Sequence, residues 1–567
     1  MILQALTEYY RRKTMGDEAE LAPPGFEHKE IPFVIVLDRD GRLVQIDDLR
    51  SPDGKRAKRQ LVPQAVKRTV GVSANLLWDG LEYVLGFDGR GKPERVALQH
   101  AEFRKRIEQL SDAEGDEGLA AVKKFLAGHP LAEAERCAIW PELVERNPLL
   151  TFRLAGDVDL VAQRHTVRRS LEAGAVGEAE TRCLVTGLPD RVARLHPSIK
   201  GVRDAQSSGA SLVSYNEPAF CSFGKDQGAN APVGETAVFA YSTALNHLLR
   251  AGSPQRLQLG DATTVFWAEK ASGRPVEEAL VSWFDPPREN PDANVERVRA
   301  LYELQRGKAL TQDDRQRFYV LGLAPNAARL SVRFWQVATI AELGDRIFRH
   351  FAALEIVRPP KAPQYPSLPQ LLASIALQGK LKNVPPGLAG DWLRAILAGT
   401  AYPHTLLEAA VRRCRAEQTV NPSRAALIKA CLIRSSNPGK ENLTVSLDLS
   451  NINPGYRLGR LFAAYEKLQE EANPGINATI RDRYFGSASS SPLVAFSVLN
   501  RLKTHHLAKL SNRGLVVVRE KLIGEIMSGI DPKDPFPARL SLADQGRFAV
   551  GYYHQRQAFF EKQGGNE

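Results

Sequence analysis

The sequence has few of the features that mark secreted, membrane-bound or metal-stabilised proteins. Its 567 residues contain no run of about 18 apolar residues, so no helix is expected to cross a membrane. The N-terminal segment carries charges early and lacks a long apolar stretch, which argues against a signal peptide. The five cysteines are scattered and form no CxxC pair, which favours free thiols in a reducing compartment over a zinc finger. We therefore expect a cytoplasmic protein.

Motifs that carry known chemistries are also missing or incomplete. Residues 86–93 match GxxxxGK but end in proline, where a phosphate-binding loop needs a hydroxyl to hold Mg²⁺. Asp157 and Asp159 have no evident third metal ligand, and the adjacent His505 and His506 would point in different directions on a helix. Neither GxSxG nor HExxH occurs. We expect no catalytic activity, no cofactor and no bound metal.

The pattern of apolar residues predicts an α+β fold. A mixed α/β N-terminal region with antiparallel strands is followed by an all-α C-terminal region that ends in a helical bundle. A β-hairpin is expected over 32–47, around Arg39-Asp40-Gly41. Further strands are expected at 149–155, 182–186, 211–215, 263–269, 279–284 and 317–336, and helices at 97–110, 117–127, 236–250 and 339–355.

A proline-rich stretch, 357–369, separates the two regions, because five prolines in thirteen residues cannot continue a helix. We divide the chain into a mixed α/β region (1–356), this linker (357–369), a helical connecting region (370–444) and a C-terminal bundle (445–567). Apolar residues at helical spacing predict four bundle helices, around Leu458–Leu468, Phe496–Leu502, Leu515–Ile526 and Phe548–Phe559.

Positive charge is concentrated near the N-terminus. The net charge is +11, and residues 50–74 hold seven Lys and Arg against one Asp, a local net of +6. Such a cluster is typical of a phosphate-binding surface, although a solvated loop has the same composition. The candidate phosphate contacts in it are Lys55, Arg56, Lys58, Arg59, Lys67 and Arg68.

Residues 196–247 form the most informative stretch. It is dense in small polar residues, and its glycines would let the backbone approach a ligand closely. Lys200, Arg203 and Lys225 add positive charge beside them. A long surface loop has a similar composition, but loops of this length inside a domain are usually functional or disordered.

Four segments of the chain resemble the large-subunit family of CRISPR type I-C Cascade complexes. They are residues 65–86 (AVKRTVGVSANLLWDGLEYVLG), 194–249, 453–470 (NPGYRLGRLFAAYEKLQE) and 547–560 (RFAVGYYHQRQAFF). The resemblance implies a DNA-binding subunit of a guide-RNA complex that also contains backbone and 5′-handle-binding Cas subunits. It further implies recognition of the protospacer-adjacent motif in double-stranded DNA, promotion of R-loop formation, support of the non-target strand and recruitment of a separate helicase-nuclease.

The same resemblance implies that the motif is read from the minor groove, where small polar side chains fit. The candidate base or sugar contacts are Asn75, Gln206, Ser207, Ser208 and Asn216, with Gly209 permitting close backbone approach. Asn75 has an alternative interpretation as a helix cap, because an apolar run follows it.

The resemblance also implies that the C-terminal bundle is made separately, as a small helical subunit translated from inside the gene. Val445 is the candidate start, because the only methionine beyond Met15 is Met527, which would cut through a predicted helix. Alternatively, Val445 is an ordinary strand or cap residue of a bundle that exists only in the full chain. Candidate contacts to the displaced strand are Arg457, Arg460, Arg481, Arg483, Arg501, Lys503 and Lys509.

Two other functions stay open from the residues alone. One is a metal-dependent nuclease that uses dispersed carboxylates such as Asp157, Asp159, Glu217 and Glu235. The other is a structural scaffold of a ribonucleoprotein that reads no DNA. Cleavage assays and binding to motif-swapped duplexes would separate these from a DNA-reading subunit.

Overall fold

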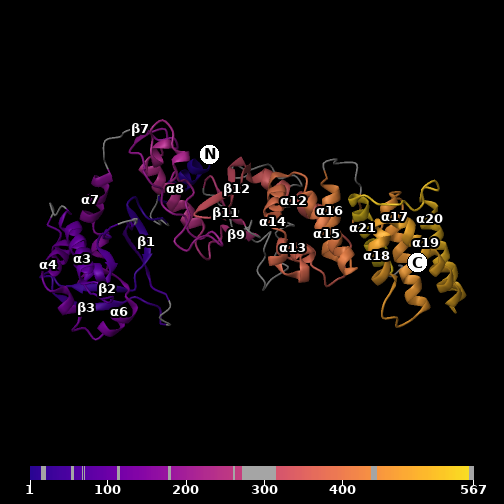
Figure 1. The fold of residues 1–567 in the computed structure, drawn as a ribbon, viewed down its shortest axis with the longest axis horizontal. Helices are drawn as coiled ribbons and strands as arrows, with labels where there is room; N and C mark the ends of the chain where they lie inside the picture. Colours follow the sequence, from indigo (N-terminus) through magenta and orange to yellow (C-terminus); the bar gives the residue numbers. More distant parts are fainter. Residues whose placement is uncertain are drawn as a thin grey trace. The chain divides into compact units, whose positions relative to one another are not determined.

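A computed structural model describes residues 1–14, 21–52, 56–66, 68, 71–110, 115–175, 181–259, 262–270, 315–435 and 443–560. The chain divides into two compact units: residues 1–199 with 211–247, and residues 200–210 with 248–567. Small sheets occur in the N-terminal part and helices fill the C-terminal part (Figure 1), so the predicted α+β class is confirmed. The predicted division into four segments remains a prediction.

The first unit contains a four-stranded sheet in the order β3-β2-β6-β5. The strands are β2 (Phe33–Leu37), β3 (Leu43–Asp48), β5 (Trp78–Gly80) and β6 (Leu149–Leu154), and β2 pairs parallel with β6 and antiparallel with β3. All five residues of β2 are buried, as expected for an apolar central strand. The predicted hairpin at 32–47 and the strand at 149–155 are confirmed.

Short helices surround this sheet: α2 (Leu81–Val84), α3 (Pro93–Glu108), α4 (Glu117–Ala127), α5 (Pro130–Ala134) and α6 (Trp140–Arg146). They bury a core that includes Phe103, Phe125 and Phe152. The helices predicted at 97–110 and 117–127 correspond to α3 and α4. Asp116 caps α4 by accepting a hydrogen bond from the backbone N–H of Leu119, at 3.0 Å.

The first unit also contains two small two-stranded sheets. One pairs β1 (Phe26–Glu30) with β4 (Arg59–Pro63), and the other pairs β7 (Thr181–Arg182) with β8 (Pro189–Asp190). Its other helices include α1 (Ile2–Thr14), η1 (Val161–Gln163), α7 (His165–Ala175) and α8 (Glu235–Leu248). Helices α1 and α8 pack together through an edge-to-face contact of Tyr10 and Phe239 at 5.6 Å. Helix α8 confirms the helix predicted at 236–250. The strand predicted at 182–186 ends at Arg182, and the one predicted at 211–215 is wrong, because that segment is irregular and lines a pocket.

The second unit begins with an antiparallel sheet in the order β12-β11-β10-β9. Its strands are β9 (Arg256–Leu259), β10 (Ala262–Ala268), β11 (Arg317–Asn326) and β12 (Arg329–Thr339). The strands predicted at 263–269 and 317–336 are confirmed, the latter as a hairpin that turns at Ala327 with φ 51°. The strand predicted at 279–284 lies outside the described residues.

Helices continue the second unit as α12 (Ile340–Leu354), α13 (Leu368–Ile375), η4 (Leu377–Gly379), η5 (Leu381–Asn383), α14 (Leu388–Ala398), α15 (His404–Glu417) and α16 (Pro422–Ile433). Helix α12 confirms the prediction at 339–355 and starts with a capping box, in which Thr339 and Glu342 satisfy each other's backbone N–H groups. None of the helices described is long and apolar enough to traverse a lipid bilayer.

The described residues 443–560 form five helices, one more than predicted: α17 (Pro454–Ala472), α18 (Ile480–Ser490), α19 (Pro492–Lys509), α20 (Arg513–Ser528) and α21 (Leu542–Ala558). Helices α17 and α21 approach closely at glycines. A Cβ atom at Gly459 would lie 2.1 Å from the Phe548 carbonyl oxygen, and one at Gly551 would lie 2.2 Å from that of Tyr456.

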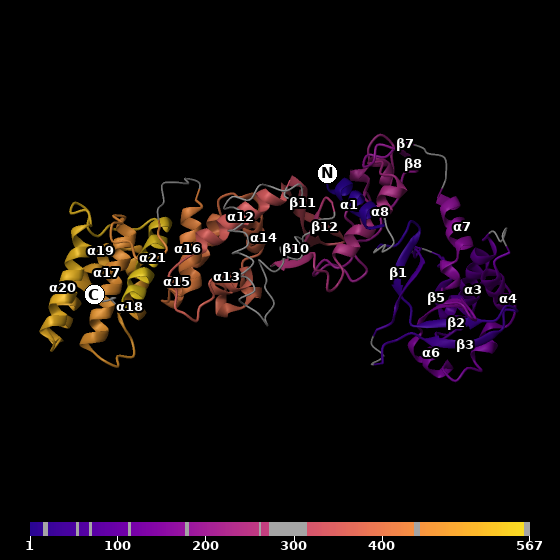
Figure 2. The same cartoon turned by 180° about the vertical axis from the view of Figure 1, so that it is seen from behind.

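Helix α21 also packs on the preceding helices, side by side with α16 in both views (Figures 1 and 2). A Cβ atom at Gly546 would meet Ile428 of α16 at 3.0 Å and Leu407 of α15 at 3.3 Å. One continuous hydrophobic core therefore joins the bundle to the rest of the second unit.

Candidate nucleic-acid interface

A long polar loop of the first unit, residues 216–230, is ordered by its own hydrogen bonds. It contains two short 3-10 turns, η2 (Pro218–Phe220) and η3 (Gln227–Asn230). The Asn230 side chain ties the loop together: its Oδ1 accepts from the Ser222 backbone N–H at 2.9 Å, and its Nδ2 donates to the carbonyls of Lys225 at 3.1 Å and Gln227 at 3.0 Å. The side-chain amide of Asn230 thus supplies hydrogen bonds to backbone groups that would pair with each other in a helix or a sheet. We call this segment the 216–230 loop.

The base of the loop is held against residues 190–196. The Gly228 N–H donates to the Arg194 carbonyl at 3.1 Å, and a Cβ atom at Gly228 would lie only 2.0 Å from the Ala193 carbonyl oxygen. Further along, the Ala193 N–H donates to the Val233 carbonyl at 3.0 Å. Only glycine fits at position 228 in this arrangement, so the loop has a fixed point of attachment.

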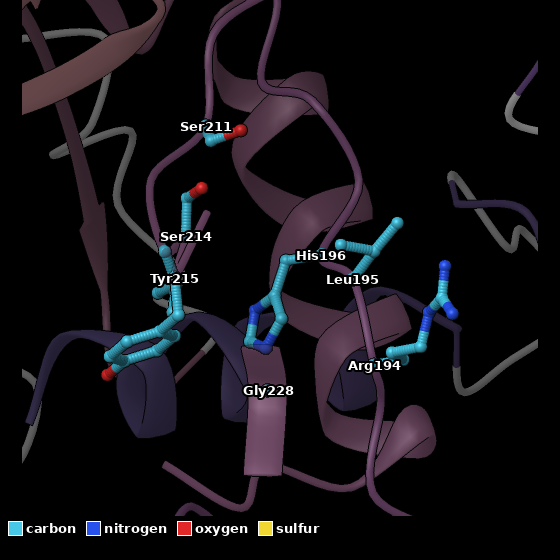
Figure 3. Close-up of a pocket in the computed structure, with 8 residues that line it drawn as sticks. Arg194, Leu195, His196, Ser211, Ser214, Tyr215 and Gly228 are labelled. Carbon is cyan, nitrogen blue, oxygen red and sulfur yellow. The ribbon is translucent and has the colours of Figure 1, made fainter. Parts of the chain in front are cut away.

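A small pocket opens beside this attachment (Figure 3), lined by Arg194, Leu195, His196, Ser211, Val213, Ser214, Tyr215 and Gly228. His196 is 5% exposed, and its Nδ1 lies 2.6 Å from the Tyr241 hydroxyl of α8. Its Nε2 has no hydrogen-bond partner among the described residues. Burial lowers the pKa of His196 to about 4, so the ring is neutral at physiological pH.

The size of the pocket limits what it accepts. Its volume of about 20 Å³ suits roughly one water molecule and is far too small for a nucleobase. The neutral imidazole of His196 forms part of the pocket wall, and its Nε2 is a hydrogen-bonding nitrogen without a partner among the described residues.

The predicted base contacts fall in different parts of the fold. Gln206, Ser207 and Ser208 are exposed in a turn of the second unit, which the Gly209 N–H closes by donating to the Gln206 carbonyl at 2.9 Å. Gly209 itself is buried and has φ 95°, which favours glycine. Asn216 is exposed and begins the loop of the first unit.

Asn75 is buried, contrary to the prediction, whereas Arg68 is exposed but paired within the fold. Asn75 is 5% exposed, and its Oδ1 accepts from the Val66 N–H at 3.0 Å, so it shapes a buried turn and presents no edge to a ligand. It is not a helix cap either, because α2 begins six residues later, at Leu81. Arg68 pairs with the buried Asp79 and stacks over the Tyr83 ring at 4.3 Å. Burial raises the pKa of Asp79 in spite of this pairing.

The other residues of the basic cluster remain candidates. Arg56, Lys58 and Arg59 are exposed, at and just before the start of β4, and the Arg59 side chain donates to the His28 carbonyl at 3.4 Å. Lys55 and Lys67 lie outside the described residues. Lys200 and Arg203 are exposed in the second unit, where Arg203 lies 3.7 Å from Asp204, and Lys225 is exposed in the 216–230 loop.

Two of the bundle arginines are structural, contrary to the prediction. Arg457 is 6% exposed and donates to the carbonyls of Asn451 at 2.7 Å and Ile526 at 3.2 Å. Arg460 is fully buried and donates to Gln555 at 3.1 Å and Glu525 at 3.2 Å. Both guanidinium groups are enclosed by the bundle and bonded to its other elements, so they are not positioned to contact a DNA strand.

The remaining bundle cations are more accessible. Arg483 and Arg501 are exposed, and Lys503 is half-buried. Arg481 lies 3.8 Å from the buried Glu466, and Lys509 donates to Asn473. Arg483 and Arg501 are therefore the bundle residues best placed to meet a strand.

The glycine-rich segment 86–92 is a turn between two helices. Backbone N–H groups of Lys92 and Arg90 lower the pKa of Asp88, so this carboxylate already occupies the anion position of the turn. A phosphate there would meet like charge.

The carboxylates considered for a nuclease are partly engaged elsewhere. Asp157 pairs with Arg164 at 2.7 Å, and Glu235 pairs with Arg191 at 2.6 Å. Within the described part of the chain, no three His, Cys, Asp or Glu side chains are grouped so as to hold a metal ion. All five cysteines are free.

Sequence reasoning missed three residues of this region: Phe223, Arg194 and His196. Phe223 is 98% exposed at the tip of the 216–230 loop, Arg194 is exposed beside the pocket, and His196 is buried behind it. The prediction favoured small polar side chains, whereas the available signal was an aromatic residue between Ser222 and Gly224 in a polar loop.

Comparison with known proteins supports the family resemblance. A search of curated proteins finds no match. A model of the CRISPR-associated protein family Cas_Csd1 matches residues 6–560, nearly the whole chain and both of its units. The chain therefore belongs to the Cas_Csd1 family of CRISPR-associated proteins.

Proposed function

We propose that this chain is the large subunit of a type I-C RNA-guided surveillance complex and that it reads the protospacer-adjacent motif in double-stranded DNA. Family membership supports a subunit of a CRISPR complex. The observation that carries the finer proposal is the 216–230 loop, which is internally hydrogen-bonded, anchored at Gly228 and exposed over most of its length. Preformed polar loops of this kind bind without a large ordering cost.

In this proposal, small polar side chains contact bases or sugars, and basic side chains contact phosphates. Gln206, Ser207, Ser208 and Asn216 contact base edges or sugars in the minor groove, where the guanine amino group distinguishes G·C from A·T pairs. Exposed cations contact phosphates, which adds affinity without sequence preference. These cations are Arg56, Lys58, Arg59, Lys200, Arg203 and Lys225.

The 216–230 loop itself carries little net charge. Lys225 is its one cation, against Glu217 and Asp226. Its contribution to binding is therefore expected to come mainly from shape, hydrogen bonds and stacking. The salt-dependent part of the affinity is expected to come mainly from the exposed cations outside the loop: Arg56, Lys58, Arg59, Lys200 and Arg203.

The chain is proposed to lack catalytic activity and to act in the cytoplasm with a guide RNA, other Cas subunits and a separate helicase-nuclease. After unwinding, Arg483 and Arg501 of the bundle would hold the displaced strand through weak, sequence-independent contacts. Base pairing with the guide would read the remaining target.

The test compares guide-RNA complexes assembled with and without this chain on a duplex library randomised beside the target. With the chain, we expect a few flanking sequences to be enriched, at about 1–3 kcal/mol per preferred base pair. Omission should abolish this preference and leave guide pairing to single-stranded target intact. An equal preference without the chain would indicate that the chain is a scaffold that reads no DNA. Mg²⁺-dependent cleavage by the purified chain would indicate a nuclease.

A further inference from the structure

The tip of the 216–230 loop holds an aromatic ring in an unusual backbone conformation. Phe223 has φ 53° and Gly224 has φ 68°, and the Lys225 N–H donates to the Ser222 carbonyl at 3.0 Å. Two successive residues with positive φ inside such a bond are the pattern of a type I′ turn, whose central positions normally hold Gly, Asn or Asp. A bulky residue is a clear outlier there.

Folding removes almost none of the Phe223 ring from water. Phe223 is 98% exposed, so its side chain is nearly as hydrated as in an unfolded chain. The turn beneath it is nevertheless fixed, because Asn230 binds both Ser222 and Lys225. The Phe223 backbone is strained, its ring is exposed, and the turn that carries it is fixed by hydrogen bonds. This combination indicates that the ring binds a ligand.

We infer that Phe223 is an aromatic finger that inserts next to a DNA base and stacks on it where the duplex begins to open; this rests on the proposed function. Apolar side chains inserted between base pairs unstack them. Stacking of the exposed base on an aromatic ring then offsets part of the lost base-stacking energy. Phenylalanine has no hydrogen-bonding group, so the finger acts on any base pair and leaves sequence reading to polar neighbours.

The surroundings of the ring favour a nucleic acid over a protein partner. Ser222 and Gly224 keep the turn narrow. The exposed Lys225 beside them is followed by the exposed Asp226, so the shape of the turn, and not its charge, decides between partners. Phe220 of the same loop is 40% exposed, but a protein interface requires a broader apolar area than these two rings supply.

The test measures strand opening separately from binding. Complexes containing the parent chain, Phe223→Ala or Phe223→Trp are mixed with a target duplex that carries 2-aminopurine at the first base pairs beside the motif. A second duplex has those pairs mismatched and already open. Phe560→Ala is the matched control, because Phe560 is 71% exposed and lies in the second unit.

We expect Phe223→Ala to assemble normally and to bind a short motif duplex within about twofold of the parent, while its opening rate falls at least about tenfold, a barrier increase of about 1.4 kcal/mol. Phe223→Trp and Phe560→Ala should open the duplex like the parent, and the mismatched duplex should restore Phe223→Ala. Normal opening by Phe223→Ala, or no rescue by the mismatched duplex, would overturn the inference.

Complex assembly and omission of the chain distinguish failure of the finger from failure of the proposed function. Failure of Phe223→Ala to assemble into the complex would assign the ring to a protein contact and refute the finger. If the parent complex opens the duplex equally well without this chain, the proposed function itself is wrong.

Discussion

Gly228→Ala should loosen the 216–230 loop without unfolding the chain. The new Cβ atom would lie 2.0 Å from the Ala193 carbonyl oxygen and 3.1 Å from that of Arg194. Both obstacles are backbone atoms, so the loop or residues 193–194 must shift. Overpacking of this kind costs about 1–3 kcal/mol. Because about 1.4 kcal/mol is a tenfold change, amide hydrogen exchange that follows local opening should accelerate about 5- to 150-fold.

Hydrogen exchange with peptide resolution on the full chain checks this prediction. Faster exchange is expected at residues 190–196 and 216–230, and unchanged exchange in α4 and α17. Gly524→Ala is the control, because position 524 lies inside α20 with no atom within 4 Å of an added Cβ, and alanine should stabilise that helix by about 1 kcal/mol. Unchanged protection of the 216–230 loop in Gly228→Ala would refute the argument that this close approach fixes the loop.

Charge, burial and helix packing elsewhere in the chain lead to four more predictions. Reversing Lys58 and Arg59 to Glu should weaken binding of the complex to all duplexes alike and lower the salt slope by about one per lost phosphate contact, measured by titration at several salt concentrations. Arg460→Ala should lower the free energy of unfolding of the second unit by about 2–5 kcal/mol in urea titrations, because it leaves a cavity at a fully buried position and removes the hydrogen-bond partner of the buried Gln555. Burial lowers the pKa of His350 to about 3, so its stabilising contribution is complete above pH 6.5 and is lost as the pH falls, by roughly 3 kcal/mol at pH 4; His350→Gln should flatten urea midpoints over that range. A fragment that starts at Val445 would leave the α15 and α16 face of α21 uncovered, so we expect it to be stable only with a partner on that face, and intact-mass analysis of the expressed gene shows whether this start is used.

Secondary structure followed from the sequence where apolar spacing was regular. The alternation around Gly41 predicted the β2–β3 hairpin, and the apolar stripe from Leu343 to Leu354 predicted α12. Helix α18 was missed because its sequence, IRDRYFGSASS, buries few apolar side chains. The strand predicted at 211–215 failed because a short apolar run does not reveal whether a neighbouring strand is available to pair with it.

The exposure of charged residues was the harder problem. Arg457 and Arg460 looked like DNA contacts, yet they lie in a helix that is buried on nearly all sides and that contacts α21 through Gly455 and Gly459. A long side chain reaches backbone carbonyls of other elements, and those partners are distant in sequence. Asn75 was misjudged for a related reason, because only the folded turn brings the Val66 backbone N–H to its side chain.

The 196–247 stretch was correctly singled out as a long, polar segment within a domain, but its composition directed attention to serine and asparagine. The conformation of Phe223 depends on the turn and on the Asn230 bonds, which no local pattern specifies. His196 likewise owes its burial to Tyr241, 45 residues away.

Site-specific crosslinking tests most directly whether this chain reads the motif. Target duplexes with a photoreactive base at each motif position are bound by the assembled complex, irradiated and digested, and the crosslinked peptides are identified by mass spectrometry. The motif bases should crosslink to peptides within residues 203–230 of this chain, and bases deeper in the target should not. Crosslinks from the motif bases to other subunits alone would contradict the account.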